Sequence, residues 1–197
     1  MTIPNRITLV RIIMIPLMAF FYLATFIPYG KIVALALFII AALTDFVDGY
    51  IARKYNMVSD LGKFLDPIAD KLLTTTALIL VICDGTVPSP YGAIAAIIIL
   101  AREFAISAFR QIAATKNFVM AADWWGKIKA NLQFFSFGAL MLLSFFYTDT
   151  NISGVGLEVF EIINWVLLGL AVLLTIISGV NYLVKNRAVL KSNKDEK

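Results

Sequence analysis

Residues 45–70 read DFVDGYIARKYNMVSDLGKFLDPIAD, and four of the five aspartates in this stretch, Asp45, Asp48, Asp66 and Asp70, form two closely spaced pairs. The first two are three positions apart and the last two are four apart, so each pair shares one face of a helix. Apolar runs flank the stretch on both sides. The pattern predicts two neighbouring helices, joined by a short polar link, that each present a pair of carboxylates.

Gly49 and Ala52 fall on the same helical face as the first pair of acids. Small residues in a membrane helix usually permit close packing against another helix. Because this face also carries two carboxylates, we expect the small residues to leave room for a ligand. Arg53 lies one position further round and can reach the same face.

The composition is typical of an integral membrane protein with one helical domain. Of 197 residues, 60% are hydrophobic, whereas soluble globular chains are closer to half apolar. Several apolar runs have the length of about 20 residues that crosses a bilayer as a helix. The first run is too long, and too poor in small residues at its end, for a cleaved signal peptide. We expect six transmembrane helices, at 7–29, 32–55, 64–83, 90–113, 127–147 and 159–183.

The basic residues are sorted to one side of this six-span arrangement. Of the 17 Lys and Arg residues, only Lys31 falls on the other side. Basic residues gather on the cytoplasmic side of membrane proteins, so both termini should be cytoplasmic. We expect one transmembrane catalytic domain over residues 1–184 and a charged cytoplasmic tail over 185–197, which is too short for a nucleic-acid arm.

The sequence contains no histidine and only one cysteine, Cys83. A histidine base, a Ser–His pair, most zinc sites and an internal disulfide are therefore excluded. Four carboxylates at one membrane interface repel each other, and divalent cations neutralise them at low cost. Oxygen ligands without His or Cys favour Mg²⁺ or Mn²⁺. Two acid pairs can bracket a two-metal site of the kind that stabilises phosphoryl displacement.

Basic residues on the same side as the acids indicate a phosphate-bearing substrate. They are Arg53, Lys63, Lys71, Arg102, Arg110, Lys127 and Lys129. Arg102 lies well inside an apolar helix, where a charged side chain usually faces a partner or water. An ion pair with Glu103, or with a carboxylate on another span, is the alternative to a ligand.

Two other groups of residues have ordinary explanations. Asn5, Thr8 and Arg11 fit a solvated helix start with a cap about as well as they fit a site. Trp124 and Trp125 are typical of the aromatic belt at a membrane interface.

The whole signature, Asp45-x2-Asp48-Gly49-x2-Ala52-Arg53-x8-Gly62-x3-Asp66-x3-Asp70, resembles that of the CDP-alcohol phosphotransferase family. The resemblance implies the six-helix fold of that family, a divalent-metal site, a CDP-linked donor and release of CMP. It assigns metal binding to Asp45, Asp48, Asp66 and Asp70. It assigns nucleotide and diphosphate contacts to Gly49, Ala52, Arg53 and Gly62. Asp70 also resembles the residue proposed as the general base.

Three further motifs resemble the bacterial phosphatidylglycerophosphate synthases of this family: PNRITLVR at 4–11, REFAISAFR at 102–110 and GKIKANLQ at 126–133. The last departs at Ala130, where threonine is expected, and the resemblance ends near Gln133. It implies transfer of a phosphatidyl group from CDP-diacylglycerol to sn-glycerol 3-phosphate, at the cytoplasmic face of the plasma membrane. The acceptor phosphate would be bound by Arg102, Arg110, Lys127 and Lys129, with Arg11 and Lys63 as weaker candidates.

The sequence leaves other functions open. Another acceptor of the same family, such as inositol phosphate, serine or phosphatidylglycerol, is compatible with the signature. Acids in membranes also mark ion paths, but here they cluster at one edge and no inverted repeat is visible. A prenyl-diphosphate enzyme usually has adjacent paired acids, unlike those here. A homodimer is compatible with the sequence, which does not determine the oligomeric state.

Overall fold

The computed structural model describes residues 3–54, 60–115, 124–150, 152 and 154–186. Within these ranges, the side chains at 3, 4, 46, 48–53, 60, 61, 63, 64, 114 and 115 lie outside the description. The described residues form six α-helices: α1 (Ile3–Leu23), α2 (Gly30–Lys54), α3 (Asp60–Cys83), α4 (Tyr91–Thr115), α5 (Trp124–Asp149) and α6 (Val155–Lys185). The predicted all-helical class is therefore confirmed for this part of the chain.

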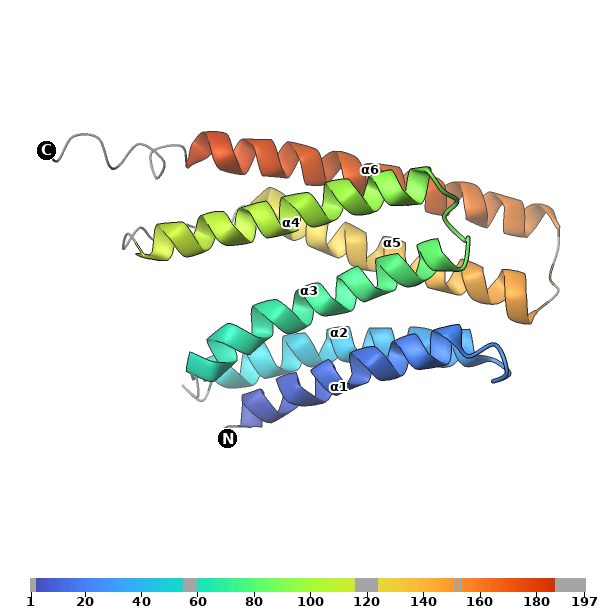
Figure 1. The fold of residues 1–197 in the computed structure, drawn as a ribbon, viewed down its shortest axis with the longest axis horizontal. Coiled ribbons are helices and arrows are strands. Elements are labelled where there is room, and N and C mark those ends of the chain that lie inside the picture. Colours follow the sequence, from blue (N-terminus) through green and yellow to red (C-terminus); the bar gives the residue numbers. More distant parts are fainter. Residues whose placement is uncertain (1–2, 55–59, 116–123, 151, 153, 187–197) are drawn as a thin grey trace, which may run out of the picture.

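The helices run alternately in opposite directions along one long axis (Figure 1). The first residues of α1, α3 and α5 consequently lie at the same end as the last residues of α2, α4 and α6. We call this end the signature end, because the aspartates of residues 45–70 lie there. The connections α1–α2, α3–α4 and α5–α6 lie at the opposite end (Figure 1).

Two apolar clusters hold the bundle together. The larger has buried residues from all six helices, and Phe38, Leu78 and Met141 are completely buried in it. The ring of Phe38 stacks on that of Phe134 with 4.9 Å between centroids, a contact that stabilises beyond area burial alone. The smaller cluster joins α4 to α6 through Ile106, Phe109, Ala113 and Tyr182. The α4–α6 pair thus has its own apolar contact at the signature end.

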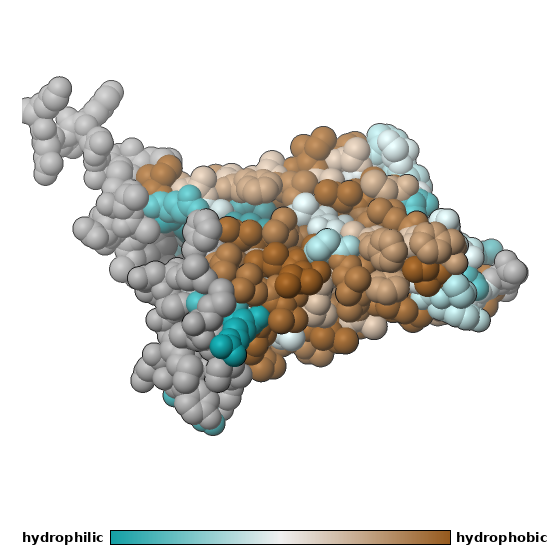
Figure 2. Space-filling model, turned by 60° about the horizontal axis from the view of Figure 1, so that its bottom comes forward, coloured by the Kyte–Doolittle hydropathy of each residue, from teal (hydrophilic) through white to brown (hydrophobic). Residues whose placement is uncertain are grey.

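The outer surface of the bundle is apolar. In the part of the chain that the structure describes, four helices are long and apolar enough to cross a membrane, namely α1, α4, α5 and α6. Only 22% of the residues in the most apolar segment of α6 are buried inside the protein. Most side chains of this helix therefore face outward. Figure 2 shows hydrophobic residues over most of the visible face and hydrophilic ones toward its ends. Such a surface is stable in lipid and not in water, which makes this a membrane protein.

Most helix boundaries differ from the prediction by a few residues, and two of these differences affect the packing or the surface. The first span was expected to reach residue 29, but α1 ends at Leu23 and residues 24–29 form turns. A Cβ atom at Gly30 would lie 2.5 Å from the carbonyl oxygen of Phe21, so α1 and α2 approach each other where only glycine fits. At the signature end, α5 begins at Trp124 rather than at residue 127, which places both exposed tryptophans on its first turn.

A buried ion-pair cluster lies at the opposite end from the signature. Lys31 Nζ donates to Asp84 Oδ2 at 2.8 Å and to Ser144 Oγ at 2.6 Å, and the hydroxyl of Tyr22 donates to the same Asp84 oxygen at 2.7 Å. The cluster joins α1, α2 and α5 to the loop after α3. Burial by itself would raise the pKa of Asp84, but the hydrogen bonds from Lys31, Ser144 and Tyr22 outweigh it and lower the pKa below its usual range.

We predict that Asp84→Asn lowers the free energy of unfolding by about 3 kcal/mol at neutral pH, because Lys31 then remains buried without a counter-charge. The folded pKa lies below the unfolded value of about 3.9, so this stabilisation is complete above that value and is lost as the pH falls through the folded pKa. Thermal unfolding in detergent should therefore show a lower melting temperature for Asp84→Asn than for the parent protein at pH 7, and this difference should become smaller below about pH 4. A difference that stays constant with pH would contradict this account.

Candidate functional site

A cavity of about 650 Å³ lies between α2, α3, α4 and α5. Its charged lining consists of Asp45, Asp70 and Glu103 together with Arg11, Lys71, Arg102, Arg110, Lys127 and Lys129. Six basic side chains thus face three acidic ones, so the described lining is cationic and suits an anionic ligand. The structure therefore brings two signature acids and all four principal candidates for the acceptor phosphate to one cavity.

Arg11 forms an ion pair with the first signature acid, Asp45. Its side chain is completely buried, and its Nη1 donates to Asp45 Oδ1 at 2.7 Å while Nε donates to the carbonyl of Ala41 at 3.0 Å. The side chain of Asp45 remains 45% exposed. Arg11 also lines the cavity, and its ion pair with Asp45 fixes the orientation of that carboxylate.

Three polar residues at the start of α1, Asn5, Thr8 and Arg11, point inward. Asn5 and Thr8 are buried like Arg11, with 5% and 1% of their surface exposed. The hydroxyl of Thr8 donates to Asp66 Oδ1 at 2.8 Å. The ordinary explanation of these residues as a solvated helix start is therefore wrong. The i, i+3, i+6 spacing puts them on one face of α1, and that face packs on α2 and α3.

The described acids offer the oxygen ligands that a hard divalent cation prefers. Asp45 and Asp70 line one cavity, and Asp66 lies one turn before Asp70 with one oxygen bound by Thr8. Oxygen-only donors fit Mg²⁺ or Mn²⁺. Among the described side chains no group of three or more metal-ligating residues converges, and the side chain of Asp48 lies outside the description. Metal binding by the four acids stays a prediction.

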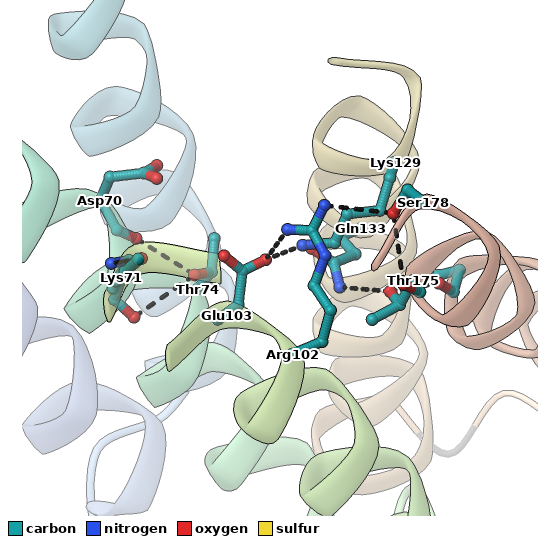
Figure 3. Close-up of polar contacts among 11 residues, drawn as sticks. Asp70, Lys71, Thr74, Arg102, Glu103, Lys129, Gln133, Thr175 and Ser178 are labelled. Atoms are coloured by element: carbon teal, nitrogen blue, oxygen red, sulfur yellow. Dashed lines mark hydrogen bonds and ion pairs between the residues drawn. The ribbon is translucent and has the colours of Figure 1, made fainter. Parts of the chain in front are cut away.

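The basic wall of the cavity is held together by Glu103. Lys129, which is only 2% exposed, forms a close ion pair with Glu103, and Arg102 Nη1 lies 3.5 Å from the same carboxylate oxygen. Figure 3 shows this group from α4 and α5, with Asp70 on the neighbouring α3. The ion pair considered for Arg102 therefore exists, and it lies in the cavity wall rather than away from it.

The last helix supplies contacts that the sequence motifs did not indicate. Arg102 Nη2 donates to Ser178 Oγ at 3.1 Å, and Arg110 Nε donates to the hydroxyl of Tyr182 at 3.1 Å. The only signal available in the sequence was the recurrence of hydroxyl groups three or four positions apart on an otherwise apolar helix.

Several predicted site residues lie where the structure describes the backbone alone. The side chains of Asp48, Ala52, Arg53 and Lys63 are outside the described residues, as is the surrounding of Gly49. Gly62 is described and is buried near the start of α3. The nucleotide contacts expected from the signature therefore stay predictions.

The family model described as CDP-alcohol phosphatidyltransferase matches residues 1–178. The chain belongs to the CDP-alcohol phosphatidyltransferase family. The predicted family is thereby confirmed, and the match continues well beyond Gln133, where the motifs of the sequence ended.

Curated relatives in this family cover nearly the whole chain. A protein of Bacillus subtilis is 39% identical over 97% of this chain and 98% of its own length. A protein of Rickettsia bellii is 36% identical over 91% and 92%, and one of Haemophilus influenzae is 34% identical over 97% and 96%. All three carry the name CDP-diacylglycerol–glycerol-3-phosphate 3-phosphatidyltransferase.

We predict that Glu103→Gln lowers the free energy of unfolding by about 3 kcal/mol, because the buried ammonium of Lys129 loses the carboxylate with which it is paired. The double variant Glu103→Gln with Lys129→Met should recover most of that loss, since neither charge then remains buried. Thermal unfolding in detergent measures both effects. The matched control is Glu158→Gln, an exposed acid on the first turn of α6, which should change little. A double variant no more stable than the single one would refute the pairing.

Proposed function

We propose that this protein transfers the phosphatidyl group of CDP-diacylglycerol to sn-glycerol 3-phosphate, giving phosphatidylglycerophosphate and CMP. The observation that carries the proposal is the single cavity in which Asp45 and Asp70 face Arg102, Arg110 and Lys129. The name shared by the relatives of this family supports the same reaction.

The basic wall favours an acceptor that carries a phosphate. Arg102, Arg110, Lys127 and Lys129 line the cavity on α4 and α5. A phosphate monoester is close to a dianion near neutral pH, and charge-assisted hydrogen bonds from several cations bind it much better than neutral donors would. Serine offers no such group, so the cavity favours glycerol phosphate, or another phosphorylated alcohol, over serine.

The cavity also reaches the lipid-facing surface, where the donor enters. Leu43, Phe134 and Phe135 line it beside the charged residues, and Phe135 is 66% exposed. The acyl chains of CDP-diacylglycerol would stay in the bilayer while its diphosphate enters the cavity. Gly49, Ala52, Arg53 and Gly62 would contact the nucleotide and diphosphate. Lys63 lies near them in sequence and is a weaker candidate for the acceptor phosphate, as is Arg11.

The acids would serve two purposes in the reaction. Asp45, Asp48, Asp66 and Asp70 would hold Mg²⁺ or Mn²⁺, with two ions as the expected number. Such ions neutralise the charge of the diphosphate and of the leaving CMP. Arg11 and Thr8 fix one oxygen each of Asp45 and Asp66, which orients the other oxygens.

Asp70 would act as the general base. It lines the cavity and is exposed there, so a hydroxyl group can approach its carboxylate. Asp70 would take the proton of the primary hydroxyl of the acceptor, and the resulting oxygen would form a bond to the phosphorus next to diacylglycerol. The bond between that phosphorus and the oxygen of CMP breaks, and Arg53 would stabilise the charge that develops on the leaving group.

The arrangement in the membrane follows from the same proposal. All six helices would span the bilayer, including α2 and α3, whose apolar runs carry the signature acids at one end. The signature end and both termini would face the cytoplasm, where glycerol phosphate is available, and the membrane would be the plasma membrane. Residues 1–184 would form the catalytic domain and 185–197 a charged tail.

We predict that the purified protein releases CMP from CDP-diacylglycerol when sn-glycerol 3-phosphate is supplied with Mg²⁺ or Mn²⁺. Serine, which has no phosphate, should give at most about one hundredth of that rate, since it leaves the buried cations unpaired. Inositol phosphate and phosphatidylglycerol at equal concentration should also react more slowly than sn-glycerol 3-phosphate. Thin-layer separation of radiolabelled products identifies the lipid formed. A preference for any other acceptor would refute the assignment, and cation flux into liposomes without CMP release would indicate a transporter.

We predict that Asp70→Asn lowers kcat by about a hundredfold or more, because general-base catalysis contributes that much and the amide cannot accept the proton. A second measurement must separate base from ligand, since Asp70 is also a predicted metal ligand. Mn²⁺ affinity, followed by electron paramagnetic resonance, should fall far less in Asp70→Asn than in Asp45→Asn. Turnover like that of the parent at saturating Mn²⁺ would dismiss Asp70 as the base.

A further inference from the structure

The guanidinium group of Arg110 is held by a buried tyrosine on α6. Arg110 Nε donates to the hydroxyl of Tyr182 at 3.1 Å, and its central carbon lies 5.2 Å from the centre of the tyrosine ring. Both a hydrogen bond and a cation–π contact therefore join the two residues. Because Nε is used in this bond, the two terminal amino groups of the guanidinium can be presented together to a ligand.

Tyr182 is itself rigidly held. It is only 2% exposed, and its ring meets that of Phe109 edge to face with 6.3 Å between centroids. Ile106 and Ala113 complete this cluster. A flexible arginine on an exposed part of α4 is thus anchored to a side chain that cannot change rotamer without disturbing the α4–α6 contact.

A second arginine is anchored to α6 one turn away. The hydroxyl of Ser178 donates to the carbonyl of Thr175 at 3.2 Å, which leaves its oxygen to accept from Arg102 Nη2 at 3.1 Å. A Cβ atom at Gly179 would lie 3.0 Å from Arg102 Cγ, so α6 passes very close to the stem of this arginine. The chain of contacts continues through Thr175, whose hydroxyl accepts from Gln133 Nε2 at 3.2 Å.

We infer that α6 determines acceptor affinity without touching the acceptor: Tyr182 and Ser178 are positioning residues that hold Arg110 and Arg102 in the cavity wall. This inference rests on the proposed function, in which these arginines bind the acceptor phosphate. The cost of ordering two long side chains is met when the protein folds, so it no longer weakens acceptor binding. The donor site, on α2 and α3, does not depend on these contacts.

The test is a double-mutant cycle between Arg110 and Tyr182 in the purified full-length protein. Tyr182→Phe keeps the ring and removes the hydroxyl, so we expect the KM for sn-glycerol 3-phosphate to rise about fivefold, the loss of one hydrogen bond. The KM for CDP-diacylglycerol and kcat should stay within about twofold. Arg110→Ala should raise the acceptor KM by about fiftyfold. The double variant should resemble Arg110→Ala alone, because Tyr182 acts only through Arg110.

Two further variants keep the inference falsifiable. Ser178→Ala should raise the acceptor KM a few-fold through Arg102. Tyr147→Phe is the control, since this tyrosine hydroxyl also joins α6 to another helix: from α5 it donates to Glu161 Oε2 at 2.5 Å, at the opposite end of the bundle. Its acceptor KM should equal that of the parent. Thermal unfolding of each variant shows that the fold is intact.

The outcomes separate this inference from the proposed function. An unchanged acceptor KM in Tyr182→Phe, or effects of Tyr182→Phe and Arg110→Ala that multiply in the double variant, would overturn the inference and leave the proposed function standing. Equal increases of donor and acceptor KM would overturn it as well. If the parent protein releases no CMP in response to sn-glycerol 3-phosphate, the proposed function fails and the inference fails with it.

Discussion

A charge buried among lipid-facing helices needs a partner within reach, because lipid supplies none. Among the described residues, three ion pairs meet this requirement by joining different parts of the fold. Arg11 joins α1 to Asp45 on α2, Lys31 joins α2 to Asp84 after α3, and Lys129 joins α5 to Glu103 on α4. Apolar contacts alone would let such helices slide against each other, whereas paired charges permit few alternatives.

The charged residues of the cavity fall on two walls. Asp45 and Asp70 stand on α2 and α3, beside Arg11 of α1 and Lys71 of α3, while the other four basic residues, Arg102, Arg110, Lys127 and Lys129, stand on α4 and α5. Glu103 keeps the basic wall from being an uncompensated group of cations in the absence of substrate. A reaction that joins two phosphate-bearing substrates needs a separate binding wall for each. The two anions repel each other, and each must be bound strongly enough to overcome this repulsion.

Helix α6 illustrates how an apolar helix can serve a polar site from behind. Most of its surface faces outward, and yet one narrow stripe, Thr175, Ser178, Gly179 and Tyr182, packs against the arginines of α4 and the amide of Gln133. These polar groups destabilise the helix little in the membrane, because the hydroxyls of Thr175 and Ser178 each donate a hydrogen bond to a backbone carbonyl of their own helix. The polar site thereby extends to a helix that carries no signature residue.

The sequence by itself determined the helical membrane class and the family, and it indicated that the four acids form two pairs on helix faces. Hydropathy over about 20 residues and fixed i, i+3 and i, i+4 spacings are local properties, which is why the sequence alone reveals them. It also indicated the basic residues of α4 and α5, since charges inside apolar runs are conspicuous. Only the tertiary structure decided that Thr8 and Arg11 are buried on the acids, that Glu103 pairs with Lys129, and that Ser178 and Tyr182 hold the arginines. These partners are far apart in the chain and meet only when the helices pack, and no spacing rule within one helix can reveal a contact with another.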